Sequence, residues 1–97
     1  MAIQKINTNE IENILKNIDE KSIQIKMFQE SLERINENLK FNEKDLKLGK
    51  ISMEVFKDIK PNLEKEKNGL ELQIGKTKEE IKTALSKLNG IMKENKI

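Results

Sequence analysis

The apolar residues in the first half of the chain recur every seven positions. The first position of this repeat holds Ile or Leu throughout, at Ile11, Ile18, Ile25, Leu32, Leu39 and Leu46. Three residues further on, a second position is occupied by Ile14, Lys21, Phe28, Ile35 and Asn42. Alternating steps of three and four residues are typical of a helix that packs along another helix in a coiled coil. The pattern predicts one helix over residues 9–48.

Polar residues mark the start of this helix and interrupt its apolar stripe. Asn7 and Glu10 have the spacing of a capping box, with Asn in place of Ser or Thr. At Lys21 we expect the aliphatic stem to lie along the stripe while the ammonium group reaches solvent. Asn42 has two interpretations: it fixes the register of the helices, or the apolar stripe ends there.

A turn is predicted over residues 49–52. Gly49 can adopt the left-handed conformation that follows a helix C-terminus, and Ile51 is placed to make the hydrophobic contact of a Schellman motif. Ser52 is a favourable N-cap for the next helix, and Glu54 falls in its first turn. Because so short a connection joins neighbouring helices, we expect the two helices to be antiparallel.

The second helix is predicted over residues 53–94, with a kink near Pro61 because proline lacks the backbone donor of a helix interior. Its apolar stripe has irregular spacing and consists of Phe56, Ile59, Leu63, Leu70, Ile74, Ile81, Leu85, Leu88 and Met92. Lys67 and Thr77 leave polar gaps in it. The alternative is a break at Asn68 and Gly69, which would give three helices.

The sequence therefore predicts an all-α fold: a single domain over residues 1–97 that forms a long antiparallel two-helix coiled-coil hairpin. Two helices bury only one stripe each, so we expect the chain to dimerise into a four-helix bundle. A candidate partner interface consists of the apolar residues off the main stripe, namely Leu15, Ile23, Met27, Phe41, Leu48, Met53, Val55, Leu72 and Ile91. The alternative is that these are isolated surface apolar residues, which are common.

Composition argues against catalysis. The 97 residues are 35% hydrophobic and 37% charged, and they include neither His nor Cys. A zinc site of the usual kind, a thiol nucleophile and an imidazole base are thereby excluded. Acidic pairs such as Glu79 and Glu80 alternate with lysines, as on a solvated helix face. We expect no catalytic residue, cofactor, metal or small-molecule substrate.

The charge balance by itself implies neither nucleic acid nor a membrane, and the expected partner is a protein. The net charge is +2, and the basic residues are 18 Lys and one Arg, interleaved with acidic residues. Nucleic-acid binding is the alternative, although lysine is less suited than arginine to specific phosphate recognition. No stretch approaches the roughly 18 apolar residues of a membrane span, and the N-terminus lacks the apolar run of a signal peptide. A cytoplasmic location is expected.

Residues 46–66 resemble the hairpin turn in the coiled-coil part of CdvA-type cell-division proteins. The matching residues are Gly49, Ile51, Ser52, Glu54 and Phe56. The resemblance implies a filament-forming or scaffold role alongside ESCRT-type partners, hence an accessory factor in cell division or membrane remodelling. From the residues themselves, the expected function is self-assembly and protein–protein scaffolding.

Overall fold

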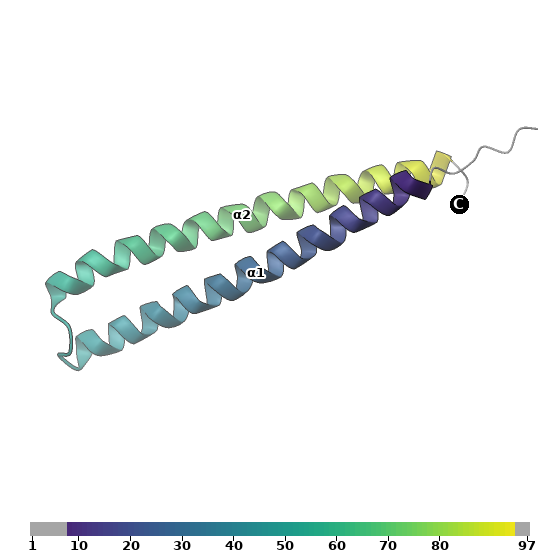
Figure 1. Cartoon of the computed structure of the whole chain (residues 1–97). Helices are drawn as coiled ribbons and strands as arrows, with labels where there is room; N and C mark the ends of the chain where they lie inside the picture. Colours follow the sequence, from purple (N-terminus) through teal and green to yellow (C-terminus); the bar gives the residue numbers. More distant parts are fainter. Residues whose placement is uncertain (1–7, 95–97) are drawn as a thin grey trace, which may run out of the picture. The chain divides into compact units, whose positions relative to one another are not determined.

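The computed structural model describes residues 8–94, which form two α-helices and no strand. Helix α1 spans Thr8–Lys47 and helix α2 spans Met53–Glu94 (Figure 1). The predicted all-α helical hairpin is confirmed. Helix α1 begins and ends one residue earlier than predicted, whereas α2 has the predicted bounds. Asn7, half of the predicted capping box, lies outside the described residues.

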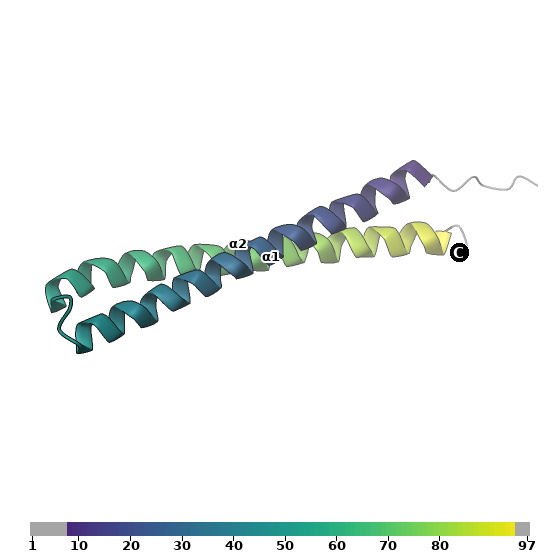
Figure 2. The ribbon, with the colours of Figure 1, turned by 60° about the horizontal axis from the view of Figure 1, so that its bottom comes forward.

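Contacts group the described residues into two units. The terminal unit combines α1 up to Ile25 with α2 from Lys76 onward, and the turn unit is Lys26–Gly75. In the terminal unit, Glu10 near the start of α1 lies 3.9 Å from Lys87 near the end of α2, measured from Oε1 to Nζ. Lys21, further along α1, pairs with Glu80, which lies earlier in α2, so the two segments of that unit are antiparallel. In the turn unit, a short connection over residues 48–52 joins the end of α1 to the start of α2 (Figures 1 and 2).

The turn is a Schellman motif centred on Gly49, which has a φ of 72°. The amide of Lys50 donates to the carbonyl of Asp45 (2.8 Å), and the amide of Gly49 donates to that of Leu46 (3.1 Å). These two bonds satisfy carbonyl groups that the last helical turn leaves without partners. The left-handed conformation predicted for Gly49 is confirmed. Ile51 is half-buried, one residue beyond the position at which the motif has its hydrophobic contact.

Ser52 caps the N-terminus of α2. Its Oγ accepts a hydrogen bond of 3.2 Å from the amide of Val55, and its carbonyl accepts the first helical bond from Phe56. This is the geometry of an N-cap, in which a side-chain oxygen satisfies an otherwise unpaired amide. Glu54 lies in the first turn, where a negative charge is favourable beside the helix dipole.

The predicted stripe of α1 is its least exposed face. Ile14 and Ile35 are buried, with 8% and 7% of their surface exposed. The other stripe residues, Ile11, Ile18, Ile25, Phe28, Leu32, Leu39 and Leu46, are half-buried. Lys21 and Asn42 are half-buried as well, so the repeat of seven holds at its polar positions too.

The stripe of α2 has a different register from the predicted one. Leu85 is 45% exposed, whereas its neighbour Ala84 and the predicted gap residue Thr77 are buried, at 9% and 7%. Ile91, assigned by sequence to the partner interface, is half-buried. A regular repeat results, consisting of Phe56, Lys60, Leu63, Lys67, Leu70, Ile74, Thr77, Ile81, Ala84, Leu88 and Ile91, all buried or half-buried. Alternating steps of four and three residues then run through the whole helix.

The prediction of Leu85 in the stripe is wrong because it followed residue hydrophobicity rather than spacing. The helix turns Ala84 toward α1, and a small side chain is thereby buried in place of the larger one beside it. Ile59 and Met92, also predicted for the stripe, are half-buried and adjoin the regular positions Lys60 and Ile91.

Helix α2 is continuous through Pro61 and Gly69, so the three-helix alternative is wrong. Pro61 has no amide to donate to the carbonyl of Lys57, four residues earlier. The side chain of Asn62 donates to the next carbonyl, that of Asp58, at 3.2 Å. The kink near Pro61 stays a prediction. Neither of the two described helices is both long and apolar enough to cross a membrane.

Candidate functional site

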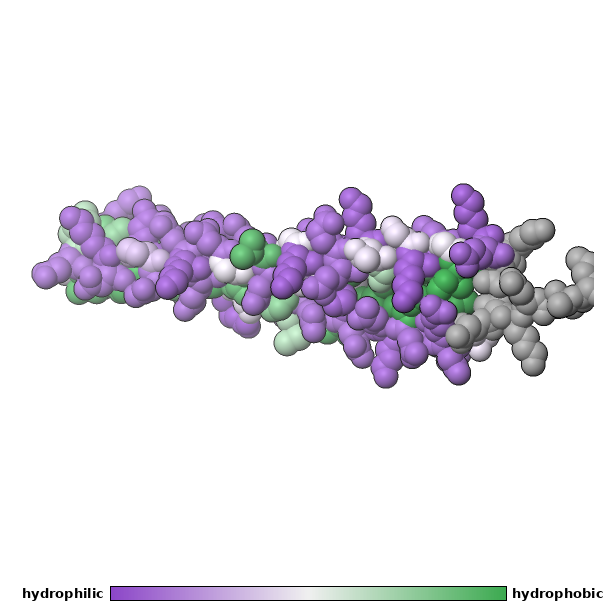
Figure 3. Space-filling model, turned by 90° about the horizontal axis from the view of Figure 1, so that it is seen from above, coloured by the Kyte–Doolittle hydropathy of each residue, from purple (hydrophilic) through white to green (hydrophobic). Residues whose placement is uncertain are grey.

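The predicted partner interface is largely exposed. Eight of its nine residues expose 44–76% of their surface, with Leu72 at 76% and Phe41 at 64% the most open. The others are Leu15, Ile23, Met27, Leu48, Met53 and Val55. On the face drawn in Figure 3, hydrophilic residues predominate and hydrophobic residues form separate areas. The structure therefore leaves large apolar side chains in solvent at several separate places.

Three of these residues lie close to the turn. Leu48 follows the end of α1, and Met53 and Val55 belong to the first turn of α2; their exposed fractions are 59%, 54% and 44%. The Schellman motif and the Ser52 cap fix the backbone that carries them. The hydrogen bonds of the turn therefore fix the positions from which Leu48, Met53 and Val55 project into solvent.

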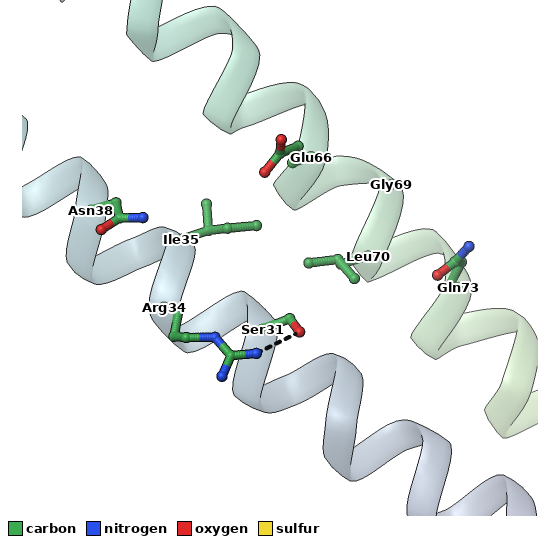
Figure 4. Close-up of a pocket in the computed structure, with 8 residues that line it drawn as sticks. All are labelled: Ser31, Arg34, Ile35, Asn38, Glu66, Gly69, Leu70 and Gln73. Carbon is green, nitrogen blue, oxygen red and sulfur yellow. Dashed lines mark hydrogen bonds between the residues drawn. The ribbon is translucent and has the colours of Figure 1, made fainter.

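A groove of about 570 Å³ lies between α1 and α2 in the turn unit. Ser31, Arg34, Ile35 and Asn38 line it from α1, and Glu66, Gly69, Leu70 and Gln73 line it from α2 (Figure 4). We call it the Arg34 groove. Ile35 and Leu70 point toward one another at its floor. Each helix contributes residues three and four apart, because these share one helix face.

Polar side chains form the walls of the Arg34 groove. The guanidinium of Arg34, the single arginine of the chain, donates to Ser31 Oγ at 3.2 Å. Glu66 stands on the opposite helix. Within the described residues, neither of these charged groups takes part in an ion pair. Gly69 leaves the wall of α2 open, since a Cβ added there would meet no atom within 4 Å.

The terminal unit has two further grooves, and four of the charged residues that line them form ion pairs within the chain. Lys21 forms an ion pair and hydrogen bond with Glu80, and Lys87 pairs with Glu10. The hydrogen bond from Lys21 and its positive charge lower the pKa of Glu80 below the ordinary value of 4.5; the charge of Lys76 contributes, and desolvation opposes the shift. The sequence predicts that the ammonium group of Lys21 reaches solvent, whereas in the structure it binds the carboxylate of Glu80 on α2.

None of these grooves presents a metal site. The part of the chain that the structure describes holds no group of three acidic, histidine or cysteine side chains close enough to share an ion. What the Arg34 groove offers is a guanidinium, a carboxylate and two amides around an apolar floor. Such a set of groups suits recognition of another protein surface, where arginine is enriched and lysine depleted.

Sequence reasoning missed the Arg34 groove. Arg34 stood out only as the single arginine, and Gly69 was interpreted as a place where α2 could break. The available signal was their position: both precede a stripe residue, Ile35 or Leu70, and therefore flank the stripe. That the two residues share one groove depends on how α1 is aligned with α2, which neither helix specifies alone.

No protein-family model matches the chain, and no curated protein or solved structure matches it either. The resemblance of residues 46–66 to CdvA-type proteins therefore stays a prediction.

Proposed function

We propose that this chain is a coiled-coil module that functions by self-association and protein–protein scaffolding. One observation carries the proposal: the hairpin exposes more large apolar side chains than it buries. Among the described residues only four hydrophobic ones are buried, Ile14, Ile35, Ile74 and Ala84, and none is less than 2% exposed. Nine large apolar residues are at least 44% exposed.

The physical reason is that two helices cover each stripe from one side only. Chains of this size need additional stabilisation when their core is small, and association with another chain is one route. A second hairpin would cover the half-buried residues from the other side, giving a four-helix bundle. Helical bundles with two hairpins per assembly bury the stripes of all four helices.

The regular heptad spacing on both helices supports the coiled-coil interpretation. The stripe of α1 and the stripe of α2 both advance by alternating steps of three and four residues. The interhelical ion pair of Lys87 with Glu10 lies beside the stripes, where coiled coils place the charges that set partner and orientation. Such surfaces serve association in preference to catalysis.

Sedimentation equilibrium over a range of micromolar concentrations tests the proposal. The expected result is a concentration-dependent mass that approaches twice the 11.3 kDa of one chain. Far-UV circular dichroism on the same samples controls for unfolding. A mass of one chain at every concentration, with helix content intact, would contradict self-association.

A further inference from the structure

We propose that a second copy of this chain docks in the Arg34 groove, with Arg34 of each copy paired with Glu66 of the other. This inference rests on the proposed self-association and names the surface through which it occurs. The groove carries one positive and one negative charge, on opposite helices. Neither is used in an ion pair of the described residues.

Twofold symmetry makes such a groove complementary to itself. In a dimer with a twofold axis, a contact from residue i to residue j is repeated from j to i. If Arg34 reaches Glu66 of the second copy, the reverse pair forms by symmetry. A guanidinium binds a carboxylate through two parallel hydrogen bonds, so both pairs would also orient the copies.

The other lining residues fit a protein surface. The floor is apolar because Ile35 and Leu70 point toward one another there, and Ile35 is only 7% exposed. Asn38 and Gln73 supply amides, and Gly69 permits close approach since nothing occupies the space beside it. The groove includes the single arginine, a residue enriched in interfaces, and none of the 18 lysines, which are depleted there.

The charged groups of the Arg34 groove are more readily available to a second copy than the paired ones in the two grooves of the terminal unit. There, Lys21 already binds Glu80, and Lys87 already binds Glu10. A partner would have to break these pairs to use the same charges. At Arg34 the guanidinium would exchange the neutral hydroxyl acceptor of Ser31 for an ionised carboxylate, to which its hydrogen bonds are stronger.

Charge reversal tests the proposal. Arg34→Glu gives a groove with two carboxylates, and Glu66→Arg gives one with two guanidinium groups. Each variant alone should dissociate, with the dimer Kd raised at least about tenfold, because like charges across an interface are strongly unfavourable. An equimolar mixture should recover a dimer, since each copy then meets the opposite charges. Sedimentation equilibrium measures all three samples.

Matched controls separate this effect from a change in overall charge. Glu33→Arg and Glu71→Arg reverse exposed carboxylates that do not line the groove, so the dimer should persist. Gly69→Leu adds a large side chain at a groove position where a Cβ meets no atom within 4 Å, and it should weaken the dimer. Gly75→Leu adds the same side chain at a glycine outside the groove and should leave the dimer intact.

The outcomes distinguish the two proposals. A wild-type chain that stays monomeric overturns self-association and the docking site together. A wild-type dimer that persists in Arg34→Glu, Glu66→Arg and Gly69→Leu overturns only the docking site. If a charge variant loses its helical circular dichroism, the Gly69→Leu and Gly75→Leu pair decides: equal dimer affinities of the two variants would exclude the groove.

Discussion

Lys21 of α1 binds Glu80 of α2 through an ion pair that is also a hydrogen bond. The lysine occupies a stripe position at which the repeat also places Ile14, Phe28, Ile35 and Asn42, and only 20% of its side chain is exposed. A half-buried ammonium group requires a partner, because loss of water is otherwise uncompensated. The pair thus links the two segments of the terminal unit at a specific alignment.

Glu80→Gln should lower stability at neutral pH and have little effect in acid. Glu80 has a lowered pKa in the folded chain because Lys21 donates to it and attracts its charge. A carboxylate with a lowered folded pKa contributes stability above its unfolded pKa, and the contribution is lost as pH falls through the folded value. Urea midpoints of wild type and variant should differ at pH 7 and converge as the pH falls below 4.5 and through the lowered folded pKa. Glu79→Gln is the control, and a pH-independent difference at Glu80 would contradict the assignment.

Gly49→Ala should destabilise the fold by about 1–2 kcal/mol, because an alanine in the left-handed conformation is strained. Gly90→Ala should have the opposite effect, a gain of about 0.5–1 kcal/mol, since this glycine lies within α2 and a Cβ there meets nothing within 4 Å. Urea unfolding followed by circular dichroism compares the two variants. Effects of the same sign would argue against the Schellman motif.

Ser52→Ala should cost about 1 kcal/mol, because the amide of Val55 loses its side-chain acceptor. Ser52→Asp keeps an acceptor at the N-cap and should retain most of the stability. Both unfolding free energies come from urea titration. An alanine variant as stable as wild type would show that the cap contributes nothing.

The register of α2 predicts unequal effects at two nearby leucines. Leu88→Ala should cost about 2 kcal/mol, because Leu88 is half-buried in the regular stripe. Leu85→Ala should cost less than about 1 kcal/mol, since nearly half of that side chain is exposed. Unfolding free energies measured under identical conditions decide between the registers, and a larger loss at Leu85 would favour the irregular stripe.

Pro61→Ala should raise stability by about 2–3 kcal/mol. The substitution restores an amide donor in the interior of α2 and removes the clash of the proline ring with the preceding turn. Asn62→Ala is the companion variant, because the Asn62 side chain bonds the carbonyl of Asp58 in the same turn. No gain from Pro61→Ala would show that α2 accommodates the proline at this position without a cost in stability.

Local features were determined by the sequence alone. The repeat of seven in α1, the left-handed Gly49 and the Ser52 cap each depend on residues a few positions apart, so helix, turn and hairpin followed directly. The same alternation of three and four residues is present in the sequence of α2. It is hard to recognise there because Lys67, Thr77 and Ala84, which are polar or small, occupy stripe positions. Packing against α1 decided which neighbour was buried, and it selected Ala84 over Leu85.

The pairing of side chains across the helices was decided only by the tertiary structure. Nothing in either helix specifies that Lys21 meets Glu80 or that Arg34 shares a groove with Glu66. These relationships depend on the alignment of α1 with α2, which the length of the turn and the fit of both stripes set together. The spacing of residues within one helix determines which side chains share a face. Which residue of the other helix lies opposite depends on how two segments far apart in sequence pack together.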